Sequence, residues 1–243
     1  DAAPFMVNLL PSYASFKDGD YTSYSTYIKA YCDIVLAEFD GTEYTKYLSV
    51  DSYPIKADGS MRDTFLYDWA VLKAYAMQYD AEMHAVLQGC GFKEADNSDY
   101  NKAPTEEQMR LQLYTALAFG ADSISWWSYY PLNVVVDGAL NADGTTTEVY
   151  NDMKTVNNEL STFGSLYKNY NWKGVIMSSP DSGFFGIGAD AQYKAYKKVK
   201  DESLFSQYLL SASNTSSFSS ISGSGSNHIV SVMEDADGNE AFV

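Results

Sequence analysis

The sequence predicts an α/β protein built around a parallel sheet. Between residue 1 and about residue 168, short apolar stretches alternate four times with longer stretches of helical periodicity. This alternation is typical of parallel strands joined by crossover helices. The 243 residues, of which 46% are hydrophobic, suffice for one large domain or for one domain and part of another. Four β/α units correspond to half of an eight-stranded barrel or to a small open sheet.

Four stretches are predicted to be strands, and each ends at polar or turn-forming residues: Phe5–Leu10, Tyr47–Pro54, Glu82–Gln88 and Ser123–Trp127. The second, YLSVDSYP, is the clearest, because its strand-forming residues are followed by Pro54, which cannot continue a ladder. Asp51, Ser52 and Tyr53 lie at its exit. The carboxyl ends of parallel strands are where α/β enzymes present groups to substrates.

The helices are predicted over about Thr22–Phe39, Asp63–Tyr79, Thr105–Gly120 and Glu148–Lys168, from apolar residues that recur every three or four positions. Thr105 and Gln108 form a capping-box pattern at the start of the third helix. The stretch Phe92–Ala103 is expected to be a polar loop, and Asp143-Gly144 is expected to form a hairpin turn.

Residues 1–168 are therefore expected to form one β/α domain, and residues 169–243 part of a β-rich domain. Strands are predicted at Gly174–Met177, His228–Met233 and Glu240–Val243, with a flexible Ser/Gly-rich loop at Ser211–Ser226. Asp235–Asn239 is expected to join the last two strands; within it, Asp235–Gly238 weakly resembles a calcium loop, but an ordinary hairpin turn is favoured. Since the chain stops within its last strand, we expect it to be a fragment of a longer protein.

Composition narrows the class of partner. A net charge of −16 repels nucleic acid and anionic membrane surfaces, and no apolar run approaches the length of a membrane span. Aromatic residues make up 15% of the chain, with 21 Tyr, and such side chains suit a neutral carbohydrate. Cys32 and Cys90 are expected to be packed free thiols, while His84 and His228 are too far apart to suggest a zinc site. No metal or other cofactor is expected.

Four strand exits resemble those of a known family. The stretches VNLLPSYAS, LSVDSYPI, HAVLQGCGF and PTEEQMRLQLYTALAFGADSISWWSYYP occur in that order, followed by the helical TTTEVYNDMKTVNNELSTFG. Together they resemble bacterial glycoside hydrolase-like proteins of clan A, which are (β/α)8 barrels related to family 42 β-galactosidases. The resemblance covers roughly residues 4 to 167 and implies strands five to eight of a TIM barrel.

The resemblance also implies where the chemistry lies. The general acid/base of this clan is a Glu at the fourth strand exit, which would precede Asp1. The nucleophile is a Glu at the seventh strand exit, where this chain has Gln88. A neutral amide is a poor nucleophile and does not form the usual glycosyl ester. Asp51, the one carboxylate at an expected strand exit, is therefore the candidate catalytic residue, with loop capping as its simpler role.

Seven further residues are expected to bind substrate: Asn8, Tyr13, Tyr53, Gln88, Trp126, Trp127 and Tyr129. Tyr53 resembles the sixth-strand Tyr near the reaction centre, and Trp126 or Trp127 resembles the eighth-strand Trp that floors the sugar subsite. Adjacent strand residues face opposite ways, so one of the two Trp side chains is expected to lie in the core. Glu106 and Glu107 are better explained by the favourable position of negative charge at a helix N-terminus.

Two functions remain open from the sequence. One is a secreted bacterial glycoside hydrolase that acts on a neutral carbohydrate. The other is a carbohydrate-binding or structural relative that has lost the seventh-strand nucleophile. In either case, exposed sheet edges predict association with the missing N-terminal half of the barrel or with a second copy of the chain.

Overall fold

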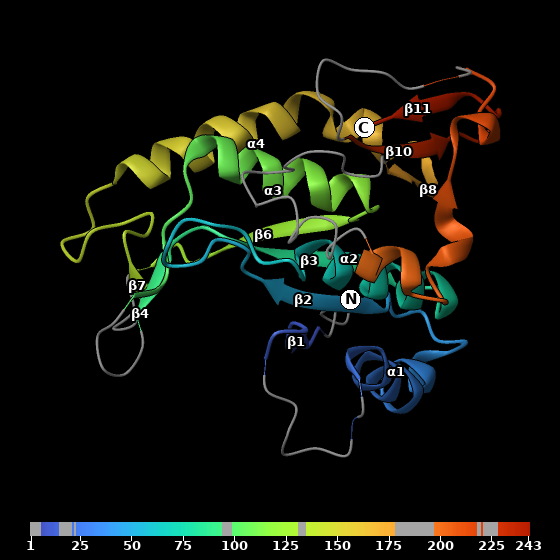
Figure 1. Cartoon of the computed structure of the whole chain (residues 1–243), viewed down its shortest axis with the longest axis horizontal. Coiled ribbons are helices and arrows are strands. Elements are labelled where there is room, and N and C mark those ends of the chain that lie inside the picture. Colours follow the sequence, from blue (N-terminus) through green and yellow to red (C-terminus); the bar gives the residue numbers. More distant parts are fainter. Residues whose placement is uncertain are drawn as a thin grey trace.

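A computed structural model describes residues 6–14, 21, 23–93, 99–130, 135–177, 197–217, 220 and 228–243. Its centre is a four-stranded sheet in which β1 (Asn8–Leu9), β2 (Tyr47–Ser52), β3 (Glu82–Gln88) and β6 (Ser123–Trp127) lie side by side in chain order (Figure 1). All three neighbouring pairs are parallel, so the predicted strand order is confirmed. Within the described residues the sheet does not close into a barrel.

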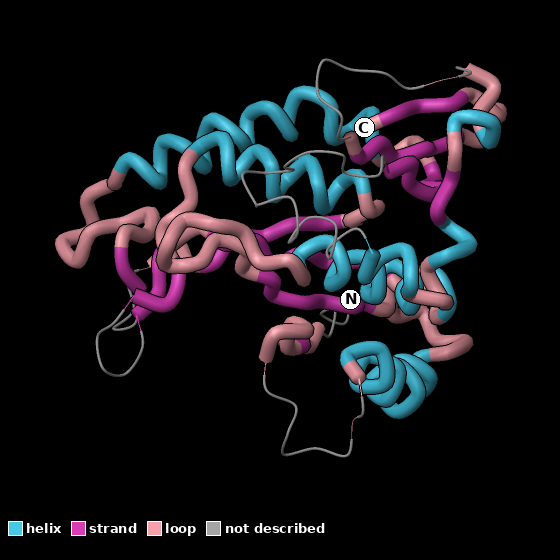
Figure 2. The backbone as a smooth tube through the Cα atoms, in the orientation of Figure 1, coloured by secondary structure: helices cyan, strands magenta, loops and turns pink. Residues whose placement is uncertain are grey.

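A helix follows each of these strands: α1 (Tyr24–Ile34), α2 (Phe65–Gln78), α3 (Glu106–Ala118) and α4 (Glu148–Tyr167). Figure 2 shows this alternation, with helices in cyan and strands in magenta. The capping box predicted for α3 is present, because Thr105 accepts from the Gln108 amide while the Gln108 side chain accepts from the Thr105 amide. Gly120, with φ +79°, closes the helix as predicted.

The first helix is shorter than predicted. The α-helix ends at Ile34, and a 3₁₀ turn, η1 (Leu36–Phe39), replaces its last part. The β-branched Ile34 and Val35 lose side-chain freedom in an α-helix, which favours a tighter irregular end. Thr22, the predicted start, lies outside the described residues.

The predicted polar loop Phe92–Ala103 contains two short strands instead. β4 (Gly91–Lys93) pairs with β5 (Asp99–Asn101) and with β7 (Val135–Val136) in a small antiparallel sheet. Strands of two or three residues are too short to show an alternating pattern in the sequence. The Asp143-Gly144 turn is confirmed by the bridge between Leu140 and Thr146.

The C-terminal sheet has the order β11 (Glu240–Phe242), β10 (Ile229–Glu234), β8 (Asn171–Met177) and β9 (Leu209–Leu210). The turn at Asp235–Asn239 is confirmed, because the Asp235 carboxylate accepts from two main-chain amides of the turn. β8 begins before the predicted Gly174, and β9 and two 3₁₀ turns, η2 (Ser206–Tyr208) and η3 (Ala212–Asn214), were not predicted.

The Ser/Gly-rich stretch Ser211–Ser226 is described only in part. Its first section contains η3, and the amides and hydroxyls of Ser216 and Ser217 donate to the Glu240 carboxylate over 2.6–3.1 Å. This part of the predicted flexible loop is therefore tied to the edge strand β11. Residues 218–219 and 221–227 lie outside the described residues.

The two larger sheets share one hydrophobic core across residue 168. The Trp172 indole of β8 donates to the Ala118 carbonyl at 2.9 Å, and the buried Lys73 ammonium of α2 donates to the Gly120 carbonyl at 2.7 Å. The Phe205 ring stacks on Phe119 with centroids 5.6 Å apart. The end of α3 is thus the point where the C-terminal sheet is attached.

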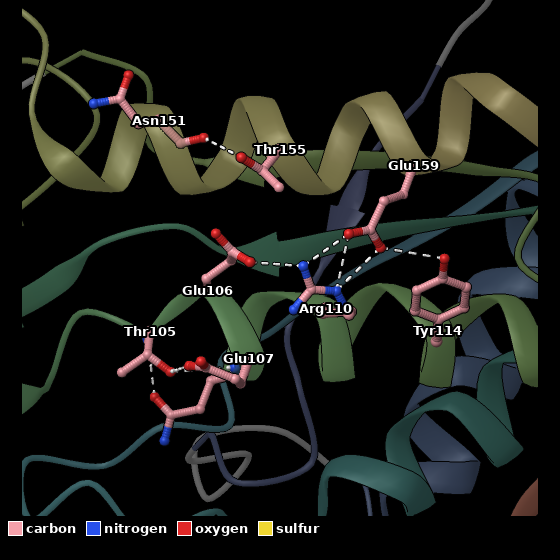
Figure 3. Close-up of polar contacts among 9 residues, drawn as sticks. Thr105, Glu106, Glu107, Arg110, Tyr114, Asn151, Thr155 and Glu159 are labelled. Atoms are coloured by element: carbon pink, nitrogen blue, oxygen red, sulfur yellow. Dashed lines mark hydrogen bonds and ion pairs between the residues drawn. The ribbon is translucent and has the colours of Figure 1, made fainter.

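Helices α3 and α4 lie side by side and are joined by charged groups (Figure 3). Arg110 donates to Glu159 of α4 at 2.7 Å and to Glu106 of its own helix at 2.7 Å, and the Tyr114 hydroxyl donates to Glu159 at 3.3 Å. Glu107 accepts from the Thr105 hydroxyl. Glu106 and Glu107 thus occupy the first turn of α3, as the sequence predicted.

Gly120 and Gly144 form a matched pair that tests this attachment. Both have positive φ, but a Cβ at position 120 would lie 2.7 Å from Trp172 Cγ and 2.8 Å from Lys73 Cε, whereas nothing lies within 4 Å at position 144. Gly144→Ala should therefore cost only the left-handed backbone strain, about 1–2 kcal/mol. Gly120→Ala should cost at least about 1 kcal/mol more. Urea unfolding measures both, and equal losses would contradict the close packing at Gly120.

Candidate functional site

The register of the parallel strands separates polar from apolar side chains. Paired residues in β1, β2, β3 and β6 face the same side, and alternate residues face the opposite side. The side packed against the helices is apolar and includes Leu9, Leu48, Val50, Met83, Ala85 and Leu87, all buried. The other side, called here the polar face, carries Asn8, Ser49, Asp51, His84, Val86, Gln88, Ser123, Ser125 and Trp127.

Asp51 lies on the polar face near the carboxyl end of β2, where it is half-buried. Its carboxylate accepts hydrogen bonds from the side chains of Asn8 and Tyr53. The Asn8 amide oxygen in turn accepts from the Ser49 hydroxyl at 2.8 Å, which orients the amide nitrogen toward Asp51. Burial raises the pKa of Asp51 above its usual value of 3.8, although these hydrogen bonds oppose the shift.

Tyr53 and Tyr13 form the next layer of the site. The Tyr53 main-chain amide donates to the Tyr13 hydroxyl at 3.0 Å, and the Tyr53 ring stacks on Phe92 of β4 with centroids 5.1 Å apart. Arg62 lies 4.2 Å from the centre of the Tyr13 ring and donates to the Tyr53 carbonyl at 3.1 Å. Burial raises the pKa of both phenols, so they remain neutral donors over the physiological range.

Gln88 reaches the same end of the sheet but is fully buried. Its amide oxygen accepts from the Ile55 amide at 2.8 Å, and its amide nitrogen donates to the carbonyls of Lys102, Cys90 and Ile55 over 2.8–3.3 Å. The Gln88 main-chain amide donates to the side-chain oxygen of Gln112 in α3, and the Gln112 side-chain nitrogen donates to the Gln88 carbonyl. The side chain therefore fastens the loops around the site, rather than presenting a free group to a ligand.

The two tryptophans of β6 face opposite ways, as predicted. Trp126 turns toward α4, where its indole donates to Asn157 at 2.9 Å. Trp127 follows the register of Gln88 on the polar face and is 41% exposed. Tyr129 is 60% exposed after the strand, with its ring 6.5 Å from that of Tyr150. Of the aromatic candidates on β6, Trp127 is the one on the same face as Asp51.

Two polar residues close to these strands, His84 and Asp68, were not predicted from the sequence. His84 lies on the polar face, where its two ring nitrogens contact the hydroxyls of Ser123 and Ser125 at 2.7 and 3.0 Å. The sequence feature that could have indicated His84 is the placement of polar residues at alternate positions of two predicted strands. Asp68 is fully buried on the helix side of the sheet. Its signal was a carboxylate on the apolar stripe of a helix.

No metal site accompanies these residues: the described part of the chain contains no group of three or more His, Cys, Asp or Glu side chains able to hold an ion. Two pockets formed by described residues lie elsewhere. One, of about 560 Å³, is lined by Ser12, Thr64 and Glu202 among others. The other, of about 700 Å³, lies at the opposite end of the sheet beside Glu82 and Asp122. Both cysteines are buried free thiols, as predicted.

Comparison with known proteins adds no assignment. No protein-family model matches the chain, and no curated protein matches it significantly in sequence. Among the described residues, no helix is both long enough and apolar enough to cross a membrane.

The raised pKa of Asp51 predicts a pH dependence of stability. Because the folded state favours the protonated form, the contribution of Asp51 to the free energy of unfolding should fall as pH rises above 3.8. The difference between wild type and Asp51→Asn, measured by urea unfolding from pH 3 to 7, should therefore decrease with pH.

Asp33 is the matched control, since hydrogen bonds from Lys29 and Tyr79 lower its pKa. The difference between wild type and Asp33→Asn should increase with pH over the range in which Asp33 ionises. Slopes of the same sign for both variants would contradict the arrangement described for Asp51.

Proposed function

We propose that the polar face binds a neutral carbohydrate, with Asp51 as the central acceptor for a sugar hydroxyl. The observation that supports this most strongly is the pairing of Asp51 with Asn8 and Tyr53 at the strand exit. A carboxylate has about four acceptor positions. Because Asp51 is only half-buried, its carboxylate can accept from a ligand hydroxyl in addition to Asn8 and Tyr53.

Trp127 completes the proposed site. Its exposed ring lies on the same face of the sheet, and an aromatic surface is apolar enough to pack against the C–H groups of a sugar ring. The hydroxyls of Ser123 and Ser125 and the ring of His84 extend the polar surface between β3 and β6. A neutral polyol also suits a chain with a net charge of −16 better than an anionic ligand does.

Glycoside hydrolysis is the second candidate, and the raised pKa of Asp51 favours it. A carboxyl group that holds its proton to higher pH is better suited to general-acid catalysis. Hydrolysis ordinarily needs two carboxylates across the scissile bond. Since Gln88 is neutral and engaged with the surrounding loops, the second carboxylate would have to come from outside the network described.

The parallel sheet also supports the proposed relation to clan A (β/α)8 barrels. Four parallel strands in chain order, each followed by a helix, agree with half of such a barrel. Polar residues then line one face and apolar residues meet the helices on the other. Under this proposal, the edges at β1 and β6 pair with further strands, supplied by a second copy of the chain or by an N-terminal half.

Carbohydrate binding predicts distinct effects for two side chains of the polar face. Asp51→Asn and Trp127→Ala should each weaken affinity for a glycoside at least about tenfold, or about 1.4 kcal/mol. Isothermal titration calorimetry with a panel of neutral mono- and oligosaccharides measures this.

Asp40→Asn is the control, because Asp40 is an exposed carboxylate paired with Lys46 before the start of β2. It should bind as wild type does. Absence of binding to every sugar by the wild type, or unchanged affinity in Asp51→Asn, would overturn the proposed site. Release of sugar by the wild type but not by Asp51→Asn would favour the hydrolase.

The proposed half barrel predicts self-association. In isolation the chain should form a dimer or larger species, because the edge strands β1 and β6 would present unpaired main-chain donors and acceptors to another chain. Light scattering after size-exclusion chromatography measures the mass, against 27.0 kDa for one chain. A monodisperse monomer that unfolds cooperatively would count against this arrangement.

A further inference from the structure

Asp68 connects the two strand exits that carry the proposed site. It lies in the first turn of α2 and is fully buried. Its Oδ1 accepts from the Ser12 main-chain amide at 3.2 Å, and its Oδ2 accepts from the Ser52 hydroxyl at 2.6 Å. Ser12 follows β1, and Ser52 is the last residue of β2. One carboxylate therefore holds the ends of two neighbouring strands from behind the sheet.

Each of these contacts immediately precedes a tyrosine of the site. Ser12 precedes Tyr13, and Ser52 precedes Tyr53. The Tyr53 amide donates to the Tyr13 hydroxyl, so the chain of contacts from Asp68 through both exits closes into a ring. Tyr53 is also a donor to Asp51. A shift of the β2 exit would therefore move a group that contacts Asp51, and a shift of the β1 exit would move the Tyr13 hydroxyl that holds the Tyr53 amide.

We propose that Asp68 is the positioning residue of this site: it fixes the two strand exits, so that Tyr13 holds the Tyr53 amide and Tyr53 is directed toward Asp51. Its effect on sugar binding rests on the function proposed above, whereas its effect on the two strand exits does not. Arg62 supports the same geometry through its contacts with the Tyr13 ring and the Tyr53 carbonyl. Asp68 lies on the opposite side of the sheet from Asp51, and its hydrogen bonds are to the two exits.

The charge of Asp68 gives the ring a pH dependence. Burial raises the pKa of Asp68 to about 6, against hydrogen bonds from Ser12 and Ser52 and the attraction of Lys198. The negative charge of Asp68 also contributes to the raised pKa of the phenols of Tyr13, Tyr24 and Tyr67. When ionised, both oxygens accept through charge-assisted hydrogen bonds; when protonated, Oδ2 donates to the Ser52 hydroxyl and Oδ1 still accepts from Ser12, but both bonds lose the charge that strengthens them. The ring should therefore be tightest above pH 6.

Amide hydrogen exchange by NMR tests the positioning without any sugar. Asp68→Ala should accelerate exchange at the Ser12 and Tyr53 amides at least tenfold, relative to amides in the middle of β3. Asp68→Asn should preserve most protection, because its amide oxygen still accepts from Ser12 and its nitrogen donates to Ser52. Asp63→Asn is the control, since Asp63 pairs with Lys198 just before α2. It should leave both amides unchanged.

The pH profile provides a second readout that remains if Asp68→Ala does not fold. The Tyr53 amide resonance of the wild type should titrate with a midpoint near pH 6, and Asp68→Asn should lack this step. Titration of His84 on the polar face is the alternative source of such a step, although burial lowers its pKa. A His84→Gln variant should therefore retain the step near pH 6. A titration that persists in Asp68→Asn, or unchanged exchange in a folded Asp68→Ala, would overturn the positioning role.

Sugar affinity then separates this inference from the proposed function. From pH 5 to pH 7, wild-type affinity should rise at least threefold more than the affinity of Asp68→Asn, in which Asp51 still titrates. If the wild type binds no sugar, the proposed function fails, and the exchange and titration results alone decide the role of Asp68. If the wild type binds and Asp68→Asn shows the same pH profile, the regulation by Asp68 is refuted and carbohydrate binding stands.

Discussion

The structure depends first on the register of four parallel strands. Because side chains alternate along a strand, a slip by one residue would move Asp51 and His84 into the apolar layer and expose Leu48 and Val50. The burial of one face against α2 and α3 therefore fixes the position of every polar group on the other. The arrangement of Asn8, Asp51 and Trp127 on one face follows from core packing as much as from their own contacts.

Buried polar groups complete the strand exits, which hydrophobic packing alone leaves unspecified. A buried amide or carboxylate without partners would cost several kcal/mol, and Gln88 and Asp68 each meet main-chain donors or acceptors of neighbouring loops. These bonds are directional, so they fix loops that lack regular hydrogen bonding. The end of the sheet beside Asp51 is for this reason built from irregular segments held at defined points.

The sequence predicted the regular elements well because they are long and periodic. Although β1 covers only Asn8–Leu9 of the predicted strand Phe5–Leu10, the parallel strands, the capping box at Thr105 and the turn at Asp143-Gly144 each had a local signal. Strands β4, β5 and β7 did not, since pairing of two or three residues depends on neighbours distant in the chain. The opposite orientations of Trp126 and Trp127 followed from strand alternation, although alternation alone did not say which ring faces the helices.

Only those residues of the candidate site that lie in or next to a predicted strand could be found from the sequence. Asp51, Asn8 and Tyr53 were found because each lies in or beside a recognisable strand. The burial of Gln88 and the bridge made by Asp68 depend on loops and helices that fold against the exits, and no pattern within one segment reveals them. Placing His84 opposite Ser123 and Ser125 required the register between β3 and β6.

The attachment of the C-terminal sheet has a consequence for how the molecule comes apart. Trp172 and Phe205 lie against the end of α3, and Lys73 links α2 to the same point. Mechanical load applied at the C-terminus would thus reach the loop between α3 and β6 directly, without first stretching a linker. Removing the residues after α4 would expose the Phe119 ring, which Phe205 now covers. An exposed apolar surface of this kind favours aggregation.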